Sequence, residues 1–177
     1  MTNSTKLGSI TATDDITVGD DLTVGDDLTV TGDLVVTGGV QTLAIAVTDA
    51  TTYTVLASNS GKVHIFPDLT ADIVVTLPTP AAGLLYEFWY GGVTADAQDW
   101  QFDTGSDTNY YVGGFVELDA SGDTVVQEIP DGNSNSKVNI LTPGAGTLIK
   151  MSCNGTLWTL NGTVQSDTAD SVTWADQ

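Results

Sequence analysis

The sequence predicts an all-β protein, with an N-terminal hexapeptide-repeat trimeric β-shaft followed by a jelly-roll-like antiparallel β-sandwich. Three observations predict this fold class. Apolar residues recur every six positions from Ile10 to Val40, and a fixed short period is typical of stacked or intertwined β structure. Short alternating segments separated by Gly, Pro and Asp follow, as they do in β-sandwiches. The sequence has no sustained i, i+3, i+4 apolar pattern of the kind that predicts helices.

This pattern divides the 177 residues into four segments. We expect a polar N-terminal arm at 1–9, a hexad-repeat trimerisation shaft at 10–42, a β-sandwich domain at 43–163 and an acidic C-terminal tail at 164–177. The sandwich segment has the length of one ordinary domain.

Each hexad is predicted to form a short strand followed by a turn. In Leu22-Thr23-Val24, the two apolar side chains share one strand face and the threonine points to the other. Gly25 and Asp26 then favour a turn. The glycine moves by one position in later hexads while the apolar period persists, which indicates that the apolar seam is the constrained feature.

The number of hexads favours a trimer. A single-chain hexapeptide solenoid takes about three hexads per coil and needs about three or more repeats, so this run would give only about two open-ended coils. Three intertwined chains close the edges, because each hexad then meets its two copies. A short solenoid and an edge hairpin of the main domain are the alternatives. The expected trimer interface consists of Ile10, Ile16, Val18, Leu22, Val24, Leu28, Val30, Leu34, Val36 and Val40.

The sandwich is predicted to consist of consecutive antiparallel strands. Within residues 84–90, Tyr86 and Phe88 share one face, and Glu87 and Trp89 share the other. An Asn-Gly pair, the strongest turn signal in the chain, predicts a type I′ hairpin between the last two expected strands. The expected strands cover 61–66, 72–77, 84–90, 112–118, 123–129, 137–141, 148–153 and 156–160.

Charge excludes two classes of partner. The chain has 23 acidic residues against four lysines, and its formal net charge is −19. Nucleic acid and anionic membrane surfaces both require basic side chains, so we expect neither as a partner. The apolar runs are too short to span a bilayer, and the first ten residues lack the apolar core of a signal peptide. We therefore expect a soluble protein.

The sequence offers little support for catalysis, cofactors or metals. His64 is the only histidine and is expected on the surface or at an interface. Paired aspartates such as Asp14-Asp15 would suit Ca²⁺ if a trimer gathered them, and solvated turn residues are the alternative. Cys153 is the only cysteine, so we expect no intrachain disulfide. We expect no catalytic, cofactor-binding or metal-binding residue.

Aromatic residues raise two further hypotheses. Trp174 lies in the polar C-terminal segment, where it would anchor on a neighbouring subunit or fold back on its own domain. Carboxylates and aromatic side chains also gather between residues 86 and 111, a candidate carbohydrate site because sugars stack on exposed aromatic faces. Core packing of these aromatics is the alternative. The cluster consists of Glu87, Trp89, Tyr90, Asp96, Asp99, Trp100, Asp103, Asp107, Tyr110 and Tyr111.

Three stretches resemble tailed-phage virion proteins. Residues 74–83, VVTLPTPAAG, together with the aromatic strand to Tyr90, are similar to a segment of small virion proteins, and so is the phrase CNGTLW at 153–158. The hexads resemble the GDLTVTG repeats of phage head-fibre and tail-fibre shafts. This resemblance implies a trimeric β-protein that sits on the capsid as a decoration (cement) protein or projects as a fibre. It implies no catalytic residue.

The expected function is structural. We expect a homotrimeric decoration protein on the outer surface of a tailed-phage capsid, made in the host cytoplasm, that stabilises the shell by bridging capsomers. Its partners would be its own copies and the major capsid protein or neighbouring decoration subunits. The alternative is a short tail fibre or spike that binds host surface glycans. We do not expect an enzyme.

Overall fold

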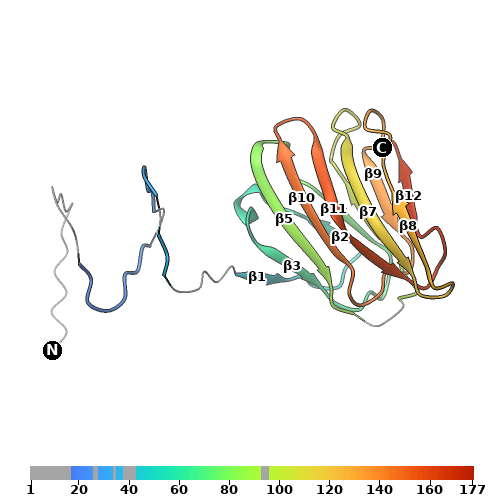
Figure 1. The fold of residues 1–177 in the computed structure, drawn as a ribbon, viewed down its shortest axis with the longest axis horizontal. Helices are drawn as coiled ribbons and strands as arrows, with labels where there is room; N and C mark the ends of the chain where they lie inside the picture. Colours follow the sequence, from blue (N-terminus) through green and yellow to red (C-terminus); the bar gives the residue numbers. More distant parts are fainter. Residues whose placement is uncertain (1–16, 26–27, 34, 38–42, 93–95) are drawn as a thin grey trace. The chain divides into compact units, whose positions relative to one another are not determined.

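The structure is a computed structural model that describes residues 17–25, 28–33, 35–37, 43–92 and 96–177 (Figure 1). The chain divides into two units, Met1–Val40 and Gln41–Gln177. The first unit contains the hexads. In the second unit, the described residues form β-strands and one short 3-10 helix, Ala57–Asn59.

Two sheets make up the second unit. The larger has seven strands in the order β1-β3-β5-β10-β11-β7-β8, and the smaller has five in the order β12-β9-β6-β4-β2. The larger sheet contains β1 (Ala44–Ala46), β3 (Val63–Phe66), β5 (Ala82–Tyr90), β7 (Tyr111–Asp119), β8 (Thr124–Glu128), β10 (Leu148–Asn154) and β11 (Trp158–Ser166). The smaller sheet contains β2 (Thr52–Thr54), β4 (Ile73–Thr76), β6 (Trp100–Asp103), β9 (Lys137–Ile140) and β12 (Val172–Ala175).

Both sheets are mixed, which corrects the expected antiparallel arrangement. Strands β1 to β6 alternate between the sheets, so that β1, β3 and β5 pair in parallel in one sheet and β2, β4 and β6 in the other. Each strand of one sheet thus serves as the crossover that a parallel pair in the other sheet requires. Antiparallel hairpins occur only later, at β7-β8 and β10-β11, among the described residues. A jelly-roll arrangement is not confirmed.

Aromatic side chains fill the space between the sheets. Phe88 of β5 lies edge-on to Phe102 of β6, with ring centroids 5.0 Å apart, and Phe66 of β3 meets Trp100 of β6 at 4.8 Å. All four rings are fully buried. Alternation along β5 confirms the predicted faces, since Tyr86 and Phe88 are buried while Trp89 is exposed. The core is therefore a two-sheet interior built from alternate residues.

The hairpin at β10-β11 is confirmed, but its turn is longer than predicted. Cys153 pairs with Trp158, so four residues separate the pair instead of two. The Asn154 side-chain oxygen accepts hydrogen bonds from the backbone amides of Thr156 and Leu157, at 2.9 and 2.8 Å. This register buries both Cys153 and Trp158, which a tighter turn would not pair.

Residues 164–177 do not form a separate tail. They complete β11 and add β12, which pairs antiparallel with β9. Trp174 of β12 stacks on Phe115 of β7, with ring centroids 5.7 Å apart and planes 15° from parallel. Of the two alternatives for Trp174, packing on its own domain is therefore the correct one.

Candidate functional site

The hexads expose their apolar side chains. Leu22 is 67% exposed and Leu28 is 60% exposed, and Val18, Val24, Val30 and Val36 are exposed as well. Within residues 17–37, the described positions form bends and extended chain and pair with no described strand. Of the expected interface residues, Ile10, Ile16, Leu34 and Val40 lie outside the described residues. The seam therefore has six described members, and all are exposed.

Metal-binding groups do not cluster in the described part of the chain. Of the paired aspartates, Asp20 and Asp21 are described and both are exposed. The described residues contain no group of three or more His, Cys, Asp or Glu side chains suited to a metal ion.

His64 lies in the core, which corrects the expected surface position. It is fully buried on β3, and its Nδ1 lies 2.8 Å from the Tyr53 hydroxyl. Burial, with a smaller contribution from the Lys62 charge, lowers the pKa of His64 to about 4. The imidazole is thus neutral at neutral pH and has no described carboxylate among its hydrogen-bond partners, so it is a core residue.

The aromatic and carboxylate cluster predicted at residues 86–111 divides between the core and the surface. Tyr90, Trp100 and Tyr111 are buried, in agreement with the core-packing alternative. Burial alone would raise the pKa of Asp96, but hydrogen bonds from the Tyr90 hydroxyl and the Leu69 amide lower it. These hydrogen bonds give Asp96 a structural role in the fold.

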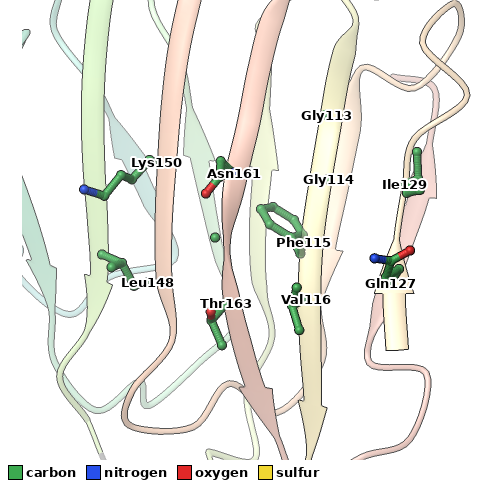
Figure 2. Close-up of a pocket in the computed structure, with 11 residues that line it drawn as sticks. Gly113, Gly114, Phe115, Val116, Gln127, Ile129, Leu148, Lys150, Asn161 and Thr163 are labelled. Carbon is green, nitrogen blue, oxygen red and sulfur yellow. The ribbon is translucent and has the colours of Figure 1, made fainter. Parts of the chain in front are cut away.

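Trp89 and Glu87 are the members of that cluster that face outward from the larger sheet. Trp89 is 44% exposed, and its indole Nε1 donates a hydrogen bond to Glu87 Oε2 at 3.4 Å. Glu87 Oε1 accepts from the Lys150 ammonium at 2.8 Å. Lys150 belongs to β10, and Figure 2 shows its side chain directed toward β5. The charged pair thus holds Trp89 beside the middle strands of the sheet.

A hollow of about 450 Å³, here called the outer groove, lies on the outward face of the same sheet across β10, β11, β7 and β8 (Figure 2). A second hollow of about 300 Å³ shares Leu148 with it and is also lined by Trp89, Tyr90, Gly146 and Thr147. Both polar and apolar side chains line the outer groove, among them Gln127, Ile129, Leu148, Lys150, Asn161 and Thr163.

Cross-strand register explains why the sequence did not point to this groove. Trp89, Leu148, Thr163, Val116 and Gln127 form one continuous row of paired residues across five strands. These positions are separated by up to 74 residues in sequence, and no short motif connects them. The sequence predicted only that Glu87 and Trp89 share one face of their strand, opposite Tyr86 and Phe88.

Comparisons with known proteins give no family. No family model matches the chain, and no curated protein matches its sequence. In the described residues, no helix has the length and apolar character needed to cross a membrane. Function is therefore inferred from the hexads and from the outward face of the larger sheet.

Proposed function

We propose that this protein is a homotrimeric structural protein of a virion, and that it decorates the outer surface of a tailed-phage capsid. In this proposal the hexads assemble three chains into a shaft, and the sandwich contacts the shell or neighbouring trimers and bridges capsomers. The proposal assigns the chain no catalytic step, cofactor or metal.

The observation that carries the proposal is the exposed apolar seam. Leu22 and Leu28 are more than half exposed in the single chain, whereas the sandwich buries its own core. Burying a leucine or valine side chain contributes about 1.5–3 kcal/mol, so a repeat of such residues strongly favours association. A regular period of six presents the same seam on every copy, which suits a closed, symmetric assembly.

Charge and resemblance support a place on a particle surface. A trimer would carry three times the formal charge of −19, and ions at physiological strength screen such charges beyond about 8 Å. Apolar contacts along the seam can therefore offset the repulsion at short range. The hexads and the segments at 74–83 and 153–158 resemble those of tailed-phage virion proteins, which favours a place on a virion surface, and the small size of the chain favours decoration over a long fibre.

Copy number in purified particles tests the decoration role. We expect quantitative mass spectrometry of particles that carry this chain to give a number of trimers comparable to the number of capsomers. We also expect chaotrope or heat to release genome from particles depleted of the protein more readily than from complete particles. A copy number matching that of a tail appendage would contradict decoration and would favour the glycan-binding fibre or spike.

A further inference from the structure

We propose that the outward face of the seven-stranded sheet binds a neutral oligosaccharide, with the exposed indole of Trp89 as the stacking surface and the outer groove holding the adjoining sugar units. This inference goes beyond virion assembly and does not depend on trimer formation.

Three glycines of the sheet, Gly113, Gly114 and Gly162, line the groove. A Cβ added at Gly113 would lie 2.2 Å from the Leu160 carbonyl oxygen, and one at Gly114 would lie 2.3 Å from the Glu128 carbonyl oxygen. Gly162 shows the same close approach, 2.2 Å, to a neighbouring carbonyl. A side chain therefore does not fit at any of these three lining positions, and glycines within strands commonly mark such close approaches. The hollow is therefore present before any ligand arrives, which lowers the cost of binding.

The groove also provides unused hydrogen-bonding groups. The side-chain amides of Asn161 and Gln127 have no hydrogen-bond partner among the described residues. A side-chain amide both donates and accepts hydrogen bonds, and so does a sugar hydroxyl. Each amide can therefore form hydrogen bonds with sugar hydroxyls in either direction. Thr163 also lines the groove, two residues after Asn161 on β11. Replacing water at these groups with sugar hydroxyls preserves their hydrogen bonds.

Trp89 gives the site an apolar platform next to these groups. Trp89 pairs directly with Leu148, and the row continues through Thr163 and Val116 to Gln127. Strands about 4.8 Å apart make this row about 19 Å long, enough for several sugar rings. The C–H face of a pyranose packs on an indole, while its hydroxyls reach the polar groups at the sides.

Charge indicates that the sugar is neutral. Glu87 and Lys150 are the charged side chains beside Trp89 on the described outward rows, and they neutralise each other at 2.8 Å. An acidic sugar would meet no unpaired cation there and would be repelled by a chain of net charge −19.

Titration of the full-length protein tests the site. The probes are cellohexaose, maltohexaose and mannohexaose, and oligogalacturonate serves as the acidic comparison. We expect at least one neutral probe to bind and to shift the NMR signals of the Trp89 indole N–H and of the Asn161 and Gln127 amides. Trp89→Ala should weaken binding about tenfold and Asn161→Ala by a smaller factor.

Leu56→Ala is the matched control, because Leu56 is also exposed but lies outside both hollows, and it should leave binding unchanged. Thermal unfolding of each variant shows whether the fold is retained. The proposal is overturned if none of the three neutral probes binds, if only oligogalacturonate binds, or if Trp89→Ala binds as tightly as the unaltered protein. A change in oligomeric mass caused by Trp89→Ala would also overturn it, because a second copy would then occupy the face.

Discussion

His64 is a neutral base enclosed by aromatic rings, and its position couples stability to pH. Its ring centroid lies 5.1 Å from that of Phe88 and 5.6 Å from that of Tyr53. Its Nε2 is buried and has no hydrogen-bond partner among the described residues. Protonation would place a charge at this position without a described carboxylate to balance it, so folding favours the uncharged ring.

Acid should therefore destabilise the protein through His64. The unfolded chain takes up a proton near the ordinary pKa of 6.5, whereas the folded chain does so only at about 4. As pH falls from 6.5 to 4, the unfolded state binds more protons and the free energy of unfolding decreases, by about 3 kcal/mol. Below about pH 4 this loss is complete.

The variant His64→Phe isolates this effect. It keeps an aromatic ring in the core but removes the titrating group, so its urea unfolding curve should depend less on pH between 6.5 and 4.5. At pH 7 the variant should lose about 1 kcal/mol, because the Tyr53 hydroxyl loses its partner. Equal pH dependence in both proteins, compared at one protein concentration, would show that His64 does not titrate as described.

Strands and their faces could be largely read from the sequence, but their partners could not. Alternation in β5 identified Tyr86 as a core residue and Trp89 as an outward one, because side chains alternate at every residue. That pattern is the same for parallel and antiparallel neighbours, so it did not reveal the crossovers from β1 to β6. The strand β6 was missed because four residues, Trp100–Asp103, carry too short a pattern. Likewise, the groove depends on cross-strand pairs that local sequence does not specify.

The role of the hexads can be tested by substitution. Replacing Leu22 and Leu28 together with Asp should abolish assembly, because it removes from each chain two apolar side chains that the proposed trimer would bury and adds charge to the seam. Thr23→Asp with Thr29→Asp is the matched control, since it adds the same charge to the opposite strand face. Sedimentation velocity should find monomers for the first pair and the unaltered assembly for the second. Identical assembly of both variants would exclude the assigned seam.

At the scale of the molecule, the two units differ in whether a single chain buries their apolar side chains. The sandwich buries its aromatic core within one chain, including Trp100 and Trp158, and needs no partner to do so. The hexads expose Leu22 and Leu28, and their described residues join no sheet. An exposed apolar repeat does not improve the solubility of a chain whose net charge is −19. Association of copies is the simplest explanation for the repeat, because exposed apolar surface commonly marks an interface.

The mass of the full-length protein in solution tests this account most directly. Measured by light scattering or native mass spectrometry at physiological salt, it should be three times the chain mass of 18.4 kDa. The measured mass should stay at this value when the protein is diluted into the micromolar range, because the whole seam contributes to every trimer. A stable species at the mass of one chain would contradict the intertwined shaft, and with it the proposed trimer.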